Sequence, residues 1–313
     1  MSAAVEVDRL VKVFPAPDGG ELRAVDDISF EVRAGEIFGI LGPNGAGKTT
    51  TLEIVEGLTE ATSGRTAVLG LDSRRDRGRM KERIGVQLQA SAYFDNLALD
   101  EILDLFGSFY ARAFPPDELL ARVGLLEKRK AKIKELSGGQ AQRFSIVAAL
   151  VNDPEVVFLD EPTTGLDPQA RRNLWDVVRE IDADGKTVVL TTHYMEEAEE
   201  LCDRVAIVDR GRIRALDTPL ALIKTLPNAY RIVFSTAREL DGAELELLPG
   251  VAEVRLSANG EGTYELSVAR PQETLEAFIA WAQANGVVAD DLRVLPATLE
   301  DVFLALTGHG LRD

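Results

Sequence analysis

Short apolar runs alternate with longer amphipathic segments through the first two thirds of the chain. Four runs of strand length, bounded by glycine, proline or acidic residues, indicate strands buried on both faces: residues 37–41, 156–160, 188–191 and 205–208. Helical spacing is found between them at 48–56 and 139–152, and Pro168 and Gly185 bound a further helix. Buried strands alternating with helices predict an α/β domain with a mainly parallel sheet. Further strands are expected at residues 5–13, 28–32, 64–70, 84–88 and 213–216.

The middle of the chain is more helical than its surroundings. Residues 100–110 and 117–123 have helical spacing, and Pro115-Pro116 separates them. Together with the helix at 139–152, they predict a helical subdomain within the α/β domain.

The pattern changes after Lys224, so we expect two domains, residues 1–224 and 225–313. The second has strand signals at 230–234, 251–256, 264–268 and 287–295, helical signals at 243–248 and 272–284, and a last amphipathic helix at 299–306. Asn259-Gly260 is a strong hairpin signal between the middle two strands. The order βαββαβ predicts a small ferredoxin-like α+β domain.

Composition narrows the classes of function. The 313 residues are 45% hydrophobic, which suffices for packed cores, and carry a net charge of −17, which disfavours nucleic acid as a partner. A basic run at residues 128–134 is expected to be a solvated face. The single cysteine, Cys202, excludes an intrachain disulfide and fits a reducing compartment. We find no signal peptide and no apolar run of the roughly 20 residues that a spanning helix needs.

A glycine-rich loop follows the first buried strand and precedes a helix. Residues 42–49 fit the pattern G-x-x-x-x-G-K-[ST], in which backbone amides and the helix N-terminus cradle phosphates. Lys48 is expected to neutralise the β- and γ-phosphates, and the Thr49 hydroxyl to ligate Mg²⁺. A chance glycine-rich turn is the alternative, but the strand–loop–helix context favours a nucleotide. The predicted nucleotide-binding residues of this segment are Gly42, Pro43, Asn44, Gly45, Ala46, Gly47, Lys48, Thr49 and Thr50.

The buried strand at 156–160 ends abruptly in acidic residues. Ligands collect at the carboxyl ends of parallel strands, so Asp160 is expected to face Mg²⁺ and Glu161 to polarise the attacking water. A solvated acidic turn is the alternative when the strand is taken by itself.

A second anion cradle is predicted at Leu136-Ser137-Gly138-Gly139-Gln140, where a serine and two glycines open a helix. The phosphate loop, this segment and the acidic strand end follow one another along the chain. With these three motifs the chain resembles the ABC ATPase family over residues 5–224, and this segment matches the family signature. A plain N-capped helix explains the serine but not the glycines.

The resemblance implies further site residues. Gln89 matches the glutamine that ligates Mg²⁺ and water and forms the hinge toward a membrane partner, with Gln87 a weaker candidate. Asp167 lies in the loop that contacts the opposite subunit, although it could also cap the helix after it. His193 matches the histidine that contacts the γ-phosphate and, with Lys48 and Glu161, completes the expected catalytic set. Phe14 matches the aromatic residue that stacks on adenine, the alternative being a core aromatic.

Two features point to one branch of this family. Thr164-Gly165 in the loop before Asp167 resembles exporters of the ABC-2 class, and residues 296–308 resemble the tail of the daunorubicin-resistance type. The tail helix is as compatible with packing on its own domain as with binding a partner. Ala141 departs from the basic residue frequent after the signature.

The resemblance implies an ATP-binding and ATP-hydrolysing subunit that requires Mg²⁺ and energises export through membrane-spanning permease subunits on a separate chain. Each ATP is expected to lie between Lys48 of one cassette and Ser137 of a second, identical or paralogous, cassette. The chain is expected at the cytoplasmic face of the membrane. A soluble ABC ATPase acting on nucleic acid or the ribosome, and an importer ATPase with a regulatory β-barrel, are the alternatives.

Overall fold

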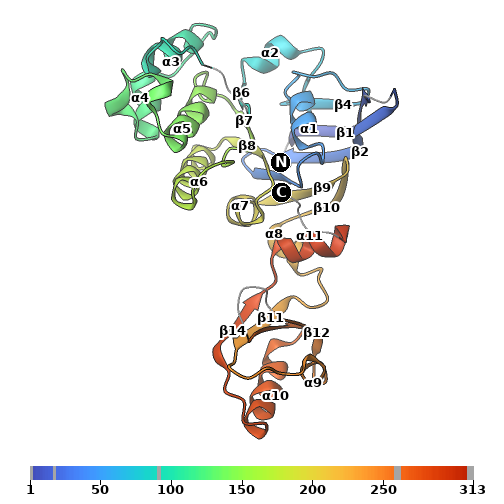
Figure 1. Cartoon of the computed structure of the whole chain (residues 1–313). Coiled ribbons are helices and arrows are strands. Elements are labelled where there is room, and N and C mark those ends of the chain that lie inside the picture. Colours follow the sequence, from blue (N-terminus) through green and yellow to red (C-terminus); the bar gives the residue numbers. More distant parts are fainter. Residues whose placement is uncertain (1–2, 17–18, 90–92, 257–261, 309–313) are drawn as a thin grey trace. The chain divides into compact units, whose positions relative to one another are not determined.

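The computed structural model describes the chain except for residues 1–2, 17–18, 90–92, 257–261 and 309–313 (Figure 1). It divides into two compact units after Pro219. The division coincides with α8 (Pro219–Ile223), the short helix that precedes the boundary expected after Lys224.

A six-stranded sheet forms the centre of the first unit, in the order β10-β9-β3-β8-β7-β6. Its neighbours pair in parallel except for β10, which runs antiparallel to β9. All residues of β3, β7 and β8 are buried, as their apolar sequences predict. The strands are β3 (Ile37–Leu41), β6 (Ile84–Gln87), β7 (Val156–Asp160), β8 (Thr187–Thr192), β9 (Arg204–Asp209) and β10 (Arg212–Asp217).

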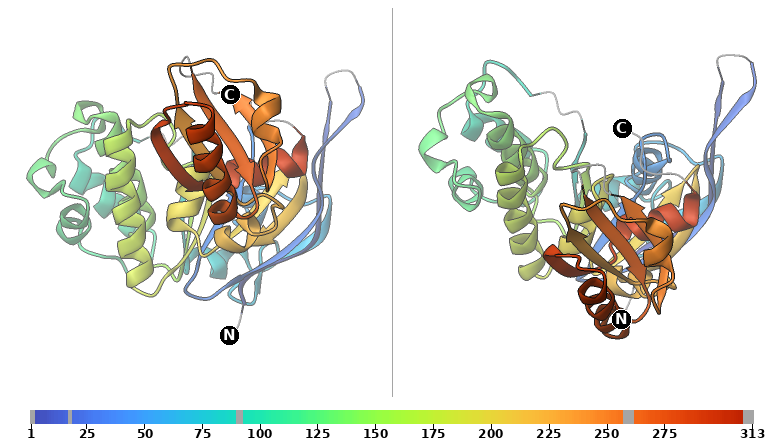
Figure 2. Two further views of the ribbon diagram at one scale, coloured as in Figure 1. Left: turned by 90° about the horizontal axis from the view of Figure 1, so that it is seen from below. Right: turned by 60° about the horizontal axis from the view of Figure 1, so that its bottom comes forward.

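A separate antiparallel sheet has the order β2-β1-β4-β5. Helix α1 (Lys48–Val55) shares one apolar core with both sheets, so it is packed between them. Figure 2 shows β1 and β2 continuing beyond this sheet as a two-stranded ribbon, which explains the polar first half of β2 that the sequence did not predict as strand. The strands are β1 (Ala3–Pro15), β2 (Glu21–Arg33), β4 (Ser63–Val68) and β5 (Leu71–Asp72).

Helices cover the other face of the parallel sheet and form the predicted helical subdomain (Figure 1). Helices α6 (Pro168–Ala183) and α7 (Met195–Leu201) pack on the sheet. The subdomain consists of α3 (Leu99–Gly107), α4 (Pro116–Arg122) and α5 (Gly138–Ala149), with two short 3₁₀ turns, Leu126–Lys128 and Ile133–Glu135. Helix α2 (Arg77–Lys81) precedes β6.

The second unit has an antiparallel sheet in the order β12-β13-β11-β14, and α9 and α10 share its apolar core. Strand order and βαββαβ succession confirm the ferredoxin-like plan. Strands β12 and β13 pair, whereas the predicted turn at Asn259-Gly260 lies outside the described residues. The elements are β11 (Tyr230–Ser235), α9 (Gly242–Glu246), β12 (Val251–Leu256), β13 (Thr263–Val268), α10 (Pro271–Ala284), β14 (Asp290–Pro296) and α11 (Leu299–Thr307).

The described helices include none with the length and apolar character needed to cross a lipid bilayer.

Candidate nucleotide site

The loop between β3 and α1 is held close to surrounding backbone. A Cβ added to Gly42 would lie 2.2 Å from the carbonyl oxygen of Val208, and one added to Gly47 would lie 2.2 Å from that of Ala24. Gly47 also has a φ of 98°, a left-handed conformation that favours glycine. The two glycines therefore let the loop turn tightly enough to direct its amides toward one point at the N-terminus of α1.

Lys48 is almost completely buried, with 4% of its surface exposed. Its Nζ donates to the carbonyl oxygens of Gly42 at 2.9 Å and Pro43 at 3.1 Å. The same nitrogen lies 3.1 Å from Oε1 of Glu161. The ammonium is thus fixed at the mouth of the loop, where it can meet phosphate oxygens.

The carboxyl end of β7 brings two acidic residues to this loop. Asp160 Oδ1 accepts hydrogen bonds from the hydroxyl of Thr49, at 3.2 Å, and from the hydroxyl of Thr191. Burial, together with the charge of Glu161, raises the pKa of Asp160. An oxygen pair of hydroxyl and carboxylate suits Mg²⁺, which keeps waters and takes its remaining ligands from substrate phosphates. Within the described ranges, no group of three or more His, Cys, Asp or Glu side chains forms a complete metal cage.

Glu161 lies at the centre of a polar cluster. Its Oε2 accepts hydrogen bonds from Oγ1 of Thr164 at 3.0 Å and Nε2 of Gln89 at 3.4 Å, and lies 3.2 Å from Nδ1 of His193. Burial opposes its ionisation, but the charge and hydrogen bond of Lys48, the hydrogen bond of Thr164 and the charge of His193 together hold the pKa of Glu161 below its usual value. A carboxylate held ionised beside histidine and glutamine can orient a water and accept its proton.

The backbone of Glu161 is itself unusual, with a φ of 46° in the left-handed region. Its amide is held by Oγ1 of Thr191 at 2.9 Å. Such a conformation costs free energy and persists only where its surroundings fix it, as they do here.

The two candidate glutamines have different environments. Gln87 is buried and its Nε2 donates to the carbonyl oxygen of Leu88 at 2.6 Å, so it serves the local backbone. Gln89 reaches Glu161 instead, and it lines a cavity of about 240 Å³ together with Thr49 and Asp160. The geometry favours Gln89 as the functional residue.

The signature segment lies apart from this cluster. Ser137 caps α5 by accepting a hydrogen bond from the amide of Gln140 at 3.4 Å, and Gln140 Oε1 accepts one from the amide of Ser137 at 3.1 Å. Ser137 and Gly138 are exposed, and a Cβ added to Gly139 would lie 3.1 Å from Cβ of Ala170 on α6. The helix tip therefore faces outward and can contact a ligand that another molecule holds.

Two other predicted residues have visible local roles. Asp167 caps α6, accepting hydrogen bonds from the amides of Gln169 at 3.0 Å and Ala170 at 2.9 Å. Phe14 is half-buried in β1 and lies outside the apolar core, and Lys12 Nζ lies 4.7 Å from its ring centre. A partly exposed ring remains compatible with stacking on a base.

Sequence reasoning missed the local roles of three residues. The sequence marks Thr164 only as part of the loop before Asp167, and Thr191 not at all, yet their hydroxyls hold the side chain and the backbone of Glu161. Glu56, at the C-terminus of α1, is 2% exposed, and burial raises its pKa to about 8. An acidic residue at a helix end suggests solvent exposure, so only the structure reveals its burial.

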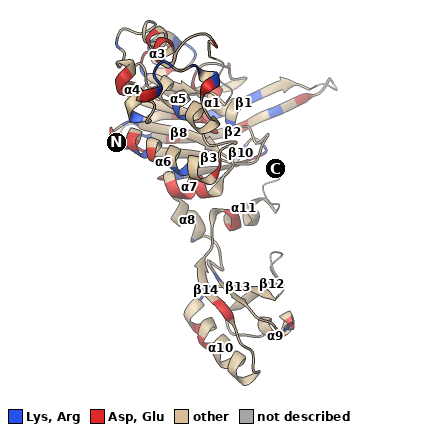
Figure 3. Cartoon of the chain, turned by 60° about the vertical axis from the view of Figure 1, so that its left-hand side comes forward, with Lys and Arg blue, Asp and Glu red and all other residues tan. Residues whose placement is uncertain are grey.

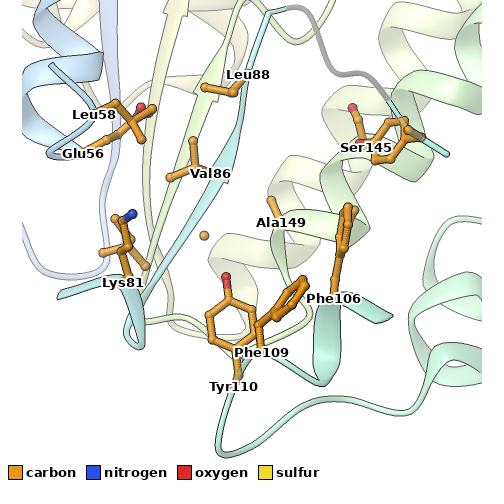
Figure 4. Close-up of a pocket in the computed structure, with 14 residues that line it drawn as sticks. Glu56, Leu58, Lys81, Val86, Leu88, Phe106, Phe109, Tyr110, Ser145 and Ala149 are labelled. Carbon is orange, nitrogen blue, oxygen red and sulfur yellow. The ribbon is translucent and has the colours of Figure 1, made fainter. Parts of the chain in front are cut away.

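An apolar pocket of about 440 Å³ lies beside the site, between β6 and the helical subdomain (Figure 4). Phe106, Phe109 and Tyr110 line one side, and Val86 and Leu88 line the other. Phe109 is 68% exposed and Leu88 is 41% exposed. Exposed aromatic and aliphatic side chains around a pocket are typical of a contact surface for another protein.

Figure 3 shows acidic residues spread over many elements of the chain. The basic run at 128–134 is partly neutralised by neighbouring carboxylates. Asp100 pairs with Lys130 at 2.7 Å and with Arg129 at 3.1 Å, and Asp117 pairs with Arg129 at 2.7 Å. This run therefore connects parts of the helical subdomain.

Comparisons with known proteins agree with this geometry. The family model described as ABC transporter matches residues 25–164. Nod factor export ATP-binding protein I of Ralstonia nicotianae is 42% identical and aligns with 94% of this chain and 92% of its own length. Linearmycin resistance ATP-binding protein LnrL of Bacillus subtilis is 36% identical over 94% of this chain and 96% of its own. Daunorubicin resistance ATP-binding protein DrrA3 of Streptomyces coeruleorubidus is 38% identical over 94% of each.

Solved structures share the fold over about two thirds of the chain. The cassette MJ0796, a dimer in a post-hydrolysis state with ADP and phosphate, has a TM-score of 0.63 at 25% identity and covers 68% of this chain and 98% of its own. An ATP-binding subunit of an ABC transporter also has a TM-score of 0.63, at 28% identity over 71% and 92%. The chain therefore belongs to the ABC transporter family, as an ATP-binding protein similar in sequence to the ATPase subunits of ABC-2 type exporters.

Proposed function

We propose that this protein hydrolyses ATP to drive export through membrane-spanning subunits on a separate chain. The observation that carries the proposal is the cluster around Glu161, where Lys48, His193 and Gln89 converge on one carboxylate. Relatives named as export and resistance ATP-binding proteins, similar over nearly the whole length, support export as the process.

The residues divide the chemistry between them. Lys48 and the loop amides hold the β- and γ-phosphates, whose oxygens compete with Glu161 for the ammonium. Glu161, released in part from Lys48, accepts a proton from the attacking water, which Gln89 and His193 orient. Thr49 and Asp160 would hold Mg²⁺, which would neutralise charge on the triphosphate.

A complete site requires a second cassette. Ser137 and Gly138 are exposed at a helix tip that makes no described contact with the phosphate loop of its own chain. The similar cassette MJ0796 is dimeric with ADP and phosphate. We infer that Ser137 of one copy binds the γ-phosphate held by Lys48 of the other, so that ATP stabilises the dimer and hydrolysis separates it.

The apolar pocket beside β6 is the proposed contact for the membrane-spanning subunit. A short apolar segment of that subunit fits its aromatic lining, and Leu88, which lines the pocket, is adjacent in sequence to Gln89. Movement at Gln89 on ATP binding is thereby transmitted to the partner. The proposed location is the cytoplasmic face of the membrane.

The test is ATP-dependent export by the chain together with its membrane-spanning partner subunit. Inverted membrane vesicles with wild-type protein should take up the exported compound with ATP, and vesicles with Glu161→Gln should not. Glu180→Gln, an exposed position on α6, is the matched control and should retain activity. Equal uptake with wild type and Glu161→Gln would exclude this mechanism.

A further inference from the structure

A polar pocket of about 450 Å³, distinct from the two described above, lies at the C-terminal end of α1, away from the phosphate loop. Residues from the end of α1 and the loop after it, from β4, from the turn after β5 and from the start of α2 line it. Its lining includes four arginines: Arg65, Arg74, Arg75 and Arg77. Hydroxyl groups of Thr59, Ser63 and Thr66 are also part of the lining.

The charge of the pocket contrasts with that of the chain. Its lining holds only two carboxylates, Glu60 and Asp72, against the four arginines, in a protein with a net charge of −17. Basic residues are unusually dense here, with five between Arg74 and Lys81. A local concentration of guanidinium groups in an acidic protein indicates an anionic ligand.

Nearby carboxylates do not fully satisfy these arginines. Asp72 accepts hydrogen bonds from the backbone amides of Arg74 at 3.0 Å and Arg75 at 2.9 Å. These bonds lower the pKa of Asp72, and the bond from Arg75 has the larger effect. Asp76 pairs with Arg79, at 3.3 Å, and accepts the amide of Asp72. Glu60, the other carboxylate of the lining, pairs with Arg74 at 3.6 Å, which leaves Arg65, Arg75 and Arg77 without an ion pair within 4.0 Å among the described residues.

Arg77 is the most informative residue of the pocket. Its Nε is buried without a hydrogen-bond partner among the described residues, where no ion pair within 4.0 Å involves Arg77 or Arg75. A Cβ added to Gly57 would lie 3.4 Å from this Nε, so the guanidinium packs over a bare stretch of backbone. This Nε is covered by backbone, so a ligand would meet the outer part of the guanidinium. Because no carboxylate of the described residues lies within 4.0 Å of Arg75 or Arg77, their charges are available to an anion in the pocket.

We propose that this pocket binds a phosphate group. Guanidinium groups match phosphate oxygens with paired hydrogen bonds, and arginines on separate elements can approach a tetrahedral anion from several directions. The volume exceeds that of one phosphate and leaves room for the remainder of a small phosphorylated molecule or a lipid headgroup. The site is separate from the ATP site, because α1 places Lys48 and Ile54 roughly 9 Å apart along its axis.

The test measures binding of inorganic phosphate to the full chain by equilibrium dialysis, with Lys48→Ala present to weaken phosphate binding at the ATP loop. Adding Arg75→Gln and Arg77→Gln should lower the affinity at least about tenfold, the worth of one or two charged hydrogen bonds. Arg79→Gln is the matched control, since Arg79 lies on the same helix but does not line the pocket, and it should leave the affinity unchanged. Arg75→Gln alone, at an exposed position, should give a smaller loss if the double variant folds poorly.

Vesicles separate the two sources of phosphate. Flotation with phosphatidic acid, but not with phosphatidylcholine, that is lost with Arg75→Gln and Arg77→Gln assigns the pocket to a lipid headgroup. Phosphate binding without flotation assigns it to a soluble phosphate compound. The proposal is overturned if the double variant binds phosphate as tightly as the Arg79→Gln control, or if millimolar phosphate does not bind the Lys48→Ala protein.

Discussion

At the scale of single residues, the site depends on one buried ion pair. The side chains of Lys48 and Glu161 are 4% and 5% exposed, and their charged atoms lie 3.1 Å apart. Each charge is tolerated in this buried position because of the other. The residues proposed for binding and catalysis are therefore also the ones that stabilise the loop.

Lys48→Ala should weaken ATP binding by at least about tenfold, because a charge-assisted contact to phosphate is lost. It should also destabilise the nucleotide-free protein by about 3 kcal/mol, since Glu161 is left as an unpaired buried carboxylate. Titration with a fluorescent ATP analogue and urea unfolding measure the two effects, with the exposed Lys224→Ala as control. Adding Glu161→Gln should restore part of the stability but not the affinity. Full restoration of both would contradict the assigned roles.

Glu56 predicts a dependence of stability on pH. Burial raises its pKa from 4.5 to about 8, so the folded chain keeps a proton that the unfolded chain releases between these values. The folded state thus loses stability as pH rises from about 4.5 to 8. Glu56→Gln has no titrating proton at this position. Its free energy of unfolding should therefore increase relative to that of wild type as pH rises from about 4.5 to 8, by at most on the order of 4 kcal/mol.

Chemical unfolding of nucleotide-free wild type and Glu56→Gln at pH 5, 6.5 and 8 checks this expectation. A difference in unfolding free energy that does not change with pH would show that Glu56 is ionised in the folded protein throughout.

At the scale of elements, the phosphate loop depends on its contact with β9. Gly42→Ala should destabilise the protein by about 2 kcal/mol and weaken ATP binding, because its Cβ would meet the Val208 carbonyl at 2.2 Å. Gly78→Ala is the matched control: no atom lies within 4 Å of its Cβ, and alanine favours helix α2. Thermal unfolding and nucleotide titration of both variants make the comparison. Equal behaviour of the two would mean that the loop is not tightly confined.

The elements that sequence could predict are those with a strong local pattern. The apolar run Val156–Asp160 predicts a buried strand, and β7 has the same bounds. All five residues are buried in the structure, as the unbroken apolar run indicates. The first half of β2 was missed, since a polar ribbon paired only with β1 lacks an alternating buried face. Strand pairing into a second, antiparallel sheet depends on long-range contacts that no local pattern encodes.

The candidate site shows the same limit. Lys48, Asp160 and Glu161 could be found because motif spacing fixes them to the ends of buried strands and a helix. The role of Thr191 and the burial of Glu56 depend on how β7, β8 and α1 pack together, which the spacing of motif residues does not specify. Gln89 and Gln87 could be ranked only when their side-chain directions were known.

At the scale of the whole molecule, the proposed function requires two copies of the chain. The phosphate loop and the tip of α5 are separate features of one chain, and each offers hydrogen-bond donors suited to the same anion. In the proposed dimer the ligand joins them across the subunit boundary, so that nucleotide state and assembly state are linked.

The most direct measurement is the molar mass of Glu161→Gln by light scattering with saturating Mg²⁺-ATP and, separately, with ADP. The account predicts a dimer with ATP and a monomer with ADP, and it predicts that adding Ser137→Arg, which fills the exposed tip of α5, abolishes the dimer while ATP still binds. A Glu161→Gln protein that stays monomeric while saturated with ATP would contradict the claim that two cassettes of this chain share each nucleotide.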